Sequence, residues 1–186
     1  MRSAPVILVR LCLALALCLA RVLPAGAQST AASPEREQLL KAAREIMAAS
    51  RYCAVITVDA AGRPVARAID AFAPDERMVV WFATNPKTRK VQDLRRDPRV
   101  TLYYFDQRSP GLGYVTMYGR ARLVDDEAEK QKRWKPEWAK LWPDRHESYL
   151  LVEVRPERLE IVSPQHGLNS DPVTWRPIVV ELGEQK

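Results

Sequence analysis

Residues 81–90 read WFATNPKTRK and join an apolar strand to a cluster of positive charge. The first four residues predict a buried strand, and the pair Asn85-Pro86 predicts a turn directly after it. Three cations and a hydroxyl then follow within four residues. Because asparagine suits a helix cap and proline suits the first helical turn, we expect a short helix over residues 87–96.

The polar side chains of this stretch predict a site for an anion. A helix start presents unpaired backbone N–H groups and the positive end of the helix dipole. Thr84 and Thr88 add hydroxyl donors. Arg89 adds a planar fork that suits phosphate oxygens, and Lys90 adds a point charge. Arg67, on the neighbouring predicted strand, can face the same side. The alternative is a basic helix start that only faces water.

The rest of the chain predicts a mainly β protein of the α+β class. An amphipathic helix is expected from Pro34 to about Ser50, and a second helix from Asp125 until Pro136 interrupts or ends it. The predicted strands are residues 52–59, 65–72, 78–83, 100–106, 113–124, 149–154 and 159–162, with a possible short strand at 178–182. Gly119 is the expected place for a bulge. Hairpin order with short helices favours an antiparallel barrel over a parallel sheet.

The N-terminal residues have the layout of a secretory signal peptide over residues 1–27. The apolar run at 11–20 is too short to span a bilayer comfortably, so we expect no stable membrane insertion after cleavage; a retained anchor is the alternative. We expect residues 28–33 to be a flexible leader, residues 34–165 to be one domain, and residues 166–186 to be a C-terminal extension. The expected location is outside the cytoplasm, either periplasmic or secreted. Cleavage removes three arginines and lowers the formal charge from +6 to +3.

Cysteine and histidine are scarce in the expected mature domain. Cys12 and Cys18 leave with the signal peptide, so Cys53 remains alone and no intrachain disulfide is expected. Cys53 lies in an apolar strand, which predicts a buried, inert thiol. His146 and His166 have no ligand partners at a recognisable spacing, so we expect structural or surface roles and no metal site.

Tryptophans at four-residue intervals, Trp134, Trp138 and Trp142, alternate with lysines and arginine. Such a segment is compatible with a nucleic-acid or membrane-surface patch. The favoured interpretation is a helix that packs its tryptophans on the domain or a second subunit and leaves the cations in water. The small net charge of the exported chain favours packing, so we expect no nucleic-acid partner.

Four motifs together resemble the flavin-binding split-barrel superfamily typified by pyridoxamine 5′-phosphate oxidase. They are RAID at 67–70, FATNPKTRK at 82–90, DLRRDPRVTLYY at 93–104 and YVTMYGRARLV at 114–124. Within that superfamily the chain is similar to the short bacterial branch of general stress protein 26 type. The resemblance extends over residues 50–162. It implies an antiparallel split β-barrel that forms a homodimer and binds FMN between its subunits.

The resemblance also implies which residues hold the cofactor. For the FMN phosphate they are Arg67, Thr88, Arg89 and Lys90. For the edge of the isoalloxazine ring they are Ala68, Ile69, Ala83 and Thr84. The second subunit is expected to contribute Tyr114, where the oxidase itself has glutamine.

Two departures from the oxidase bear on function. The oxidase holds its substrate phosphate with a lysine at the position of Phe72, and it carries a C-terminal arginine-x-histidine that this chain lacks after Trp175-Arg176. We therefore expect a flavin-dependent oxidoreductase for another small molecule, with no catalytic residue identified, rather than a true pyridoxamine phosphate oxidase. A non-catalytic flavin-binding or stress-related protein and a cofactor-less partner-binding scaffold are the alternatives. F420 and haem are less favoured cofactors than FMN.

Overall fold

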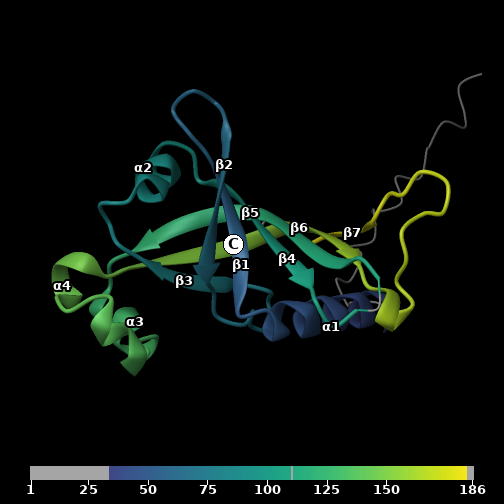
Figure 1. Cartoon of the computed structure of the whole chain (residues 1–186), viewed down its shortest axis with the longest axis horizontal. Coiled ribbons are helices and arrows are strands. Elements are labelled where there is room, and N and C mark those ends of the chain that lie inside the picture. The colour runs from purple at the N-terminus through teal and green to yellow at the C-terminus, as the bar shows by residue number, and fades with distance from the viewer. Residues whose placement is uncertain (1–33, 110, 184–186) are drawn as a thin grey trace, which may run out of the picture. The chain divides into compact units, whose positions relative to one another are not determined.

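The computed structural model describes residues 34–109 and 111–183 (Figure 1). The predicted signal peptide and leader lie outside these residues. The elements in chain order are α1 (Pro34–Ala49), β1 (Tyr52–Val58), β2 (Pro64–Asp70), β3 (Val80–Thr84), α2 (Arg89–Arg96), β4 (Arg99–Asp106), β5 (Gly113–Val124), α3 (Glu127–Lys132), η1 (Pro136–Lys140), α4 (Arg145–Ser148), β6 (Leu150–Val162), η2 (Pro164–His166) and β7 (Ile178–Glu181). No helix in the two ranges has both the length and the apolar composition needed to cross a bilayer.

The strands form one antiparallel sheet in the order β2-β1-β4-β5-β6-β3, and β7 also pairs with β6. The predicted antiparallel α+β fold is therefore confirmed. The two ends of this order meet at a single bridge between Ala71 and Phe82, beside a 2.8 Å hydrogen bond from the Phe72 amide to the Trp81 carbonyl. One bridge does not pair β2 with β3 along their length, so closure into a barrel stays a prediction.

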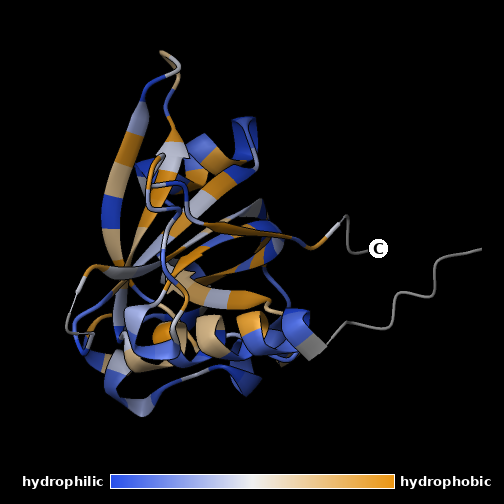
Figure 2. Ribbon diagram, turned by 90° about the vertical axis from the view of Figure 1, so that its right-hand side faces the viewer, coloured by the Kyte–Doolittle hydropathy of each residue, from blue (hydrophilic) through white to orange (hydrophobic). Residues whose placement is uncertain are grey.

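The hydrophobic core lies between the sheet and one face of α1. Ile46 and Met47 of α1 pack in one cluster with Val55, Leu102 and Met117 from β1, β4 and β5. Apolar and polar residues alternate along the strands, as Figure 2 shows. Period-two alternation places one set of side chains in the core and the other outside, which is why the strand pattern of the sequence was readable.

Residues 150–162 form one continuous strand, β6, where the sequence predicted two. The register of β5 against β6 shifts between Tyr118 and Gly119, and Gly119 pairs with Pro156. A bulge leaves a residue outside the regular ladder, and proline has no N–H to contribute to that ladder. The strand therefore continues through its proline because the irregularity falls there. The bulge predicted at Gly119 is confirmed.

Gly119 also permits a close approach of the two backbones. A Cβ atom at this position would lie 2.2 Å from the carbonyl oxygen of Arg155. We expect Gly119→Ala to lower the free energy of unfolding by about 1–3 kcal/mol, because the β5–β6 ladder must separate locally. Urea unfolding measures this loss. Gly111→Ala is the matched control, since its nearest neighbour would be 3.6 Å away; an equal loss in both variants would contradict the explanation.

Candidate functional site

The cationic stretch begins where β3 ends, and its turn differs from the predicted one. The Asn85 side chain accepts a 2.8 Å hydrogen bond from the Lys87 amide and so forms a turn instead of capping a helix. Helix α2 starts at Arg89, two residues later than predicted, with Thr88 as its N-cap residue. The Thr88 hydroxyl donates to the Asn85 carbonyl at 2.9 Å. The helix starts later than predicted because the Asn85 side chain already accepts from a backbone N–H in the turn before the helix.

Lys90 lies half-buried beside two threonine hydroxyls. Its Nζ donates to Thr84 Oγ1 at 2.9 Å, and the Oγ1 atoms of Thr84 and Thr88 are 3.4 Å apart. Burial, and then the positive charge of Arg67, lower the pKa of Lys90. In the described part of the chain the polar partner of this ammonium is a neutral hydroxyl, and no carboxylate lies within ion-pair distance. The positive charge of such an ammonium is uncompensated, so the group can pair with an anion.

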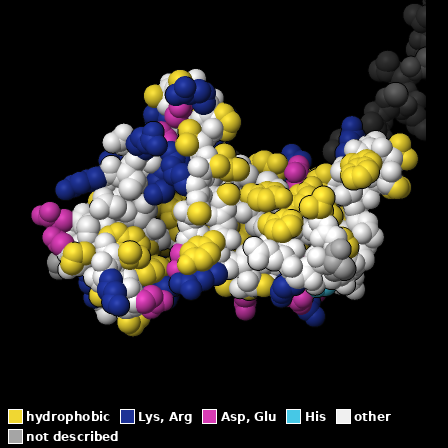
Figure 3. All heavy atoms as spheres, in the orientation of Figure 1, with side chains coloured by type: hydrophobic (Ala, Val, Ile, Leu, Met, Phe, Trp, Pro, Cys, Tyr) yellow, Lys and Arg dark blue, Asp and Glu magenta, His cyan; other side chains and the backbone are white. Residues whose placement is uncertain are grey.

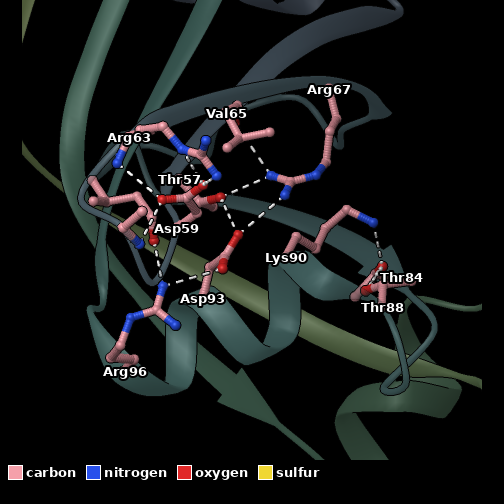
Figure 4. Close-up of polar contacts among 12 residues, drawn as sticks. Thr57, Asp59, Arg63, Val65, Arg67, Thr84, Thr88, Lys90, Asp93 and Arg96 are labelled. Atoms are coloured by element: carbon pink, nitrogen blue, oxygen red, sulfur yellow. Dashed lines mark hydrogen bonds and ion pairs between the residues drawn. The ribbon is translucent and has the colours of Figure 1, made fainter.

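Arg67 reaches the same region from β2. Its guanidinium donates to Thr57 Oγ1 at 2.7 Å and to Asp93 Oδ2 at 3.1 Å. Figure 4 shows the Lys90 side chain lying between Arg67 and the threonine pair Thr84 and Thr88. The structure thus brings together four of the residues that the sequence singled out, and two of them, Arg67 and Lys90, are cations.

Asp93 is the residue of this region that sequence reasoning missed. It lies on α2, is 6% exposed and accepts hydrogen bonds from Thr57, Arg67 and Arg96. Burial raises the pKa of its carboxyl, but these hydrogen bonds outweigh burial and hold the pKa below its usual range. The available signal was its position one helical turn after Lys90, which places both residues on neighbouring parts of one helix face.

A groove of about 710 Å³ begins at this cluster. Six of the nine predicted cofactor residues line it, namely Ala68, Ile69, Ala83, Thr84, Thr88 and Lys90. Its opposite wall comprises Trp138, Leu141 and Trp142. In Figure 3, Lys and Arg side chains gather on the surface between the β1–β2 hairpin and α2.

The three remaining predicted residues do not line this groove. Arg67 lines a second groove, of about 670 Å³, which shares Arg51, Tyr52 and Ala68 with the first. Arg89 is exposed at the first residue of α2. Tyr114 lies on β5, where its ring stacks on Tyr103 with the centroids 5.7 Å apart. Within one chain, therefore, Tyr114 is not part of the groove beside Lys90.

The tryptophans pack on their own domain, as predicted. Trp138 is buried, and its ring meets Phe72 at 5.6 Å and Trp142 at 5.1 Å between centroids. Lys135 donates to Asp70 at 3.1 Å and so ties this segment to the end of β2. Helix α3 ends before Pro136, where η1 begins, in agreement with the predicted interruption. These contacts fix the wall of the groove.

The contacts of Cys53 and His166 indicate structural roles. Cys53 is buried, and burial raises the pKa of its thiol to about 11, which confirms the expected buried thiol. His166 bonds to Ser163 Oγ at 2.6 Å and to Glu45 Oε2 at 2.8 Å, and so ties η2 to α1. The side chain of His146 lies outside the described part. The described residues contain no group of three side chains that would hold a metal ion.

Residues 39–163 match the family model described as pyridoxamine 5′-phosphate oxidase. No curated protein matches the sequence. Among solved structures, general stress protein 26 from Bacillus anthracis str. Sterne superposes with a TM-score of 0.60 at 20% identity, covering 77% of this chain and 98% of that one. A Clostridium acetobutylicum protein related to general stress protein 26 gives a TM-score of 0.63 at 20% identity, with 78% and 94% covered. A heme binding protein from Mycobacterium smegmatis gives 0.57 at 17% identity, with 76% and 57% covered.

The proximity of Arg67 and Lys90 has a measurable consequence. We expect Arg67→Gln to raise the pKa of Lys90, because a neighbouring positive charge that disfavours the ammonium is removed while burial remains. An NMR titration of the Lys90 side chain measures the change. Arg89→Gln removes the same charge from the exposed start of α2 and should shift this pKa less. An unchanged Lys90 pKa in Arg67→Gln would show that the two cations do not interact.

Proposed function

The chain belongs to the pyridoxamine 5′-phosphate oxidase family, and from this premise we propose that it binds FMN and acts as a flavin-dependent oxidoreductase on a small molecule. The main support is Lys90, a half-buried ammonium that bonds to a threonine hydroxyl and has no carboxylate partner among the described residues. Burying part of a cation in this way is costly unless an anion compensates its charge. A phosphate monoester supplies that charge together with several acceptor oxygens.

The residues around Lys90 suit the tail of FMN. Lys90, Thr84 and Thr88 would bind the phosphate together with the first backbone N–H groups of α2, since a helix start favours anions. The exposed guanidinium of Arg89, at the first residue of α2, would add a further charge-assisted contact. Arg67 lies close enough to influence the charge of Lys90 and would add to the positive field. The small apolar residues Ala68, Ile69 and Ala83 line the same groove and leave space for a flat ring.

Bound FMN would supply hydride transfer, while the protein supplies orientation and electrostatics. The tryptophan wall would shield one side of the groove from water. At the position of Phe72 the oxidase has a lysine, and here the phenyl ring packs on Trp138. Lys135 reaches the face of that ring, at 4.5 Å from its centroid, but pairs with Asp70. These contacts support a substrate other than pyridoxamine phosphate.

We also propose that the protein is a homodimer. Three aromatic side chains, Tyr52, Tyr103 and Phe105, are exposed and line the second groove. Contiguous exposed aromatics are typical of protein interfaces. A second copy covering them would bring its own Tyr114 near the cofactor, as the resemblance to the split-barrel superfamily implies.

FMN is preferred to haem because the one described histidine side chain, His166, already has partners on both ring nitrogens. Axial ligation by histidine needs a free nitrogen. F420 also has an anionic tail, so a competition experiment between F420 and FMN would distinguish the two.

The proposal is tested with the purified protein, loaded with FMN and examined by visible spectroscopy and sedimentation. We expect a yellow dimer whose flavin absorbance bleaches on addition of NADH or NADPH and returns in air. A yellow protein inert to both donors would favour the non-catalytic flavin-binding alternative. A colourless protein at millimolar FMN would contradict flavin binding and favour a partner-binding scaffold.

Phosphate recognition is tested by comparing FMN with riboflavin, which lacks the phosphate. Loss of a charge-assisted hydrogen bond costs about 1.5–3 kcal/mol. Lys90→Gln and Arg89→Ala should therefore each weaken FMN binding roughly 10- to 150-fold and leave riboflavin binding unchanged. Lys41→Gln, on the exposed side of α1, is the charge-matched control. Equal losses for both flavins would remove these residues from the phosphate site.

A further inference from the structure

Asp93 places a buried negative charge inside a cluster proposed to bind an anion. Its carboxylate is 6% exposed and lies 3.1 Å from Arg67 and 3.2 Å from Arg96. A fixed negative charge near a bound phosphate repels it, more strongly where water is excluded. On charge alone, this residue weakens the site, so its presence calls for another physical role.

The contacts of Asp93 connect three elements at one point. Its Oδ2 atom accepts from the Thr57 hydroxyl at 2.9 Å and from Arg67 at 3.1 Å. The Thr57 oxygen in turn accepts from the other terminal nitrogen of Arg67 at 2.7 Å. Thr57 lies on β1, Arg67 on β2 and Asp93 on α2. Thr57, Arg67 and Asp93 therefore form a closed hydrogen-bonded triangle, visible in Figure 4.

Arg96 adds a second link between α2 and β1. Its guanidinium donates to Asp93 Oδ1 at 3.2 Å and to the carbonyl of Val58 at 2.7 Å. The two oxygens of the Asp93 carboxylate thus each bond to one arginine. Arg67 and Arg96 together connect helix α2 to the β1–β2 hairpin.

The same helix carries Lys90 one turn before Asp93. Arg67 and Lys90 have like charges and repel. Burial lowers the pKa of Lys90 most, and this repulsion lowers it further. Asp93 offsets this repulsion by its charge and fixes the Arg67 side chain in one orientation. Because Asp93 sits on the helix that carries one cation and bonds to the other, it sets the spacing between them.

We propose that Asp93 is a positioning residue for the flavin phosphate, holding Arg67 and the helix of Lys90 at the separation that a phosphate requires. This inference rests on the proposed function. Asp93 would thus keep the cations in place for the phosphate, although its own negative charge repels that phosphate.

The substitution Asp93→Asn separates charge from position because the two effects have opposite signs. Removing a negative charge should tighten FMN binding, whereas loss of positioning should weaken it. We expect the dissociation constant for FMN to rise at least tenfold while that for riboflavin stays within twofold. Asp97→Asn is the matched control: it makes the same charge change at the end of α2, where Asp97 pairs with Arg99, and should alter FMN binding no more than twofold.

Thr57 provides a second test without a change of charge. Thr57→Val keeps the shape of this fully buried side chain and removes the hydroxyl that joins Arg67 to Asp93. FMN binding should weaken in this variant as in Asp93→Asn, and Thr57→Ser should restore it. Melting temperatures identify any variant that fails to fold. If Asp93→Asn fails to fold, the comparison of Thr57→Val with Thr57→Ser tests the positioning role.

The outcomes are distinguishable. Unchanged or tighter FMN binding by Asp93→Asn, or equal losses for FMN and riboflavin, would overturn the positioning role. If the native protein binds neither flavin, the proposed function fails. The positioning role is then decided with inorganic phosphate, followed through the NMR signal of the Arg67 side chain. A shift in the native protein that Asp93→Asn abolishes supports the role, and any other result overturns it.

Discussion

The pairing of β5 with β6 is the constraint on which the other strands depend. The two strands pair from Tyr114 opposite Val162 to Val124 opposite Leu151. On one side the order continues through β4 and β1 to β2, which carries Arg67; on the other it passes to β3, which leads into Lys90. The two cations therefore arrive from opposite ends of the strand order. They come near each other because the sheet curves until Ala71, directly after β2, bridges to Phe82 of β3.

The cations of the site differ in how much of their charge is available. Arg67 and Arg96 are already bonded to the buried carboxylate of Asp93. Lys90 has only a hydroxyl for a partner among the described residues. An incoming phosphate would thus meet one uncompensated ammonium, two threonine hydroxyls and a helix start, with the arginines held in place around them. Such preorganisation reduces the ordering that binding would otherwise require.

Much of this fold follows from local patterns in the chain. Strand β5 occupies the predicted residues 113–124, and its bulge falls at the predicted glycine, because alternation and glycine are visible within a few residues. The resemblance to the family was also recognisable from local patterns, because it rests on short motifs in a fixed order. The match to the family model confirms it. The continuity of β6 was not predictable, since it depends on a bulge opposite Pro156 that involves two distant strands. Asp93 was missed because its partners Thr57 and Arg67 lie on other elements.

The seam between β2 and β3 gives the cationic region a weak point. Elsewhere the strands are joined by ladders, but here one bridge and the amide of Phe72 make the connection. Proteins open locally where few hydrogen bonds must break, at a free energy well below that of global unfolding. Parting of this seam would move Thr84 away from β2 while the β5–β6 ladder stays intact. The seam can therefore open at a lower free energy than the ladders do, while the rest of the domain stays folded.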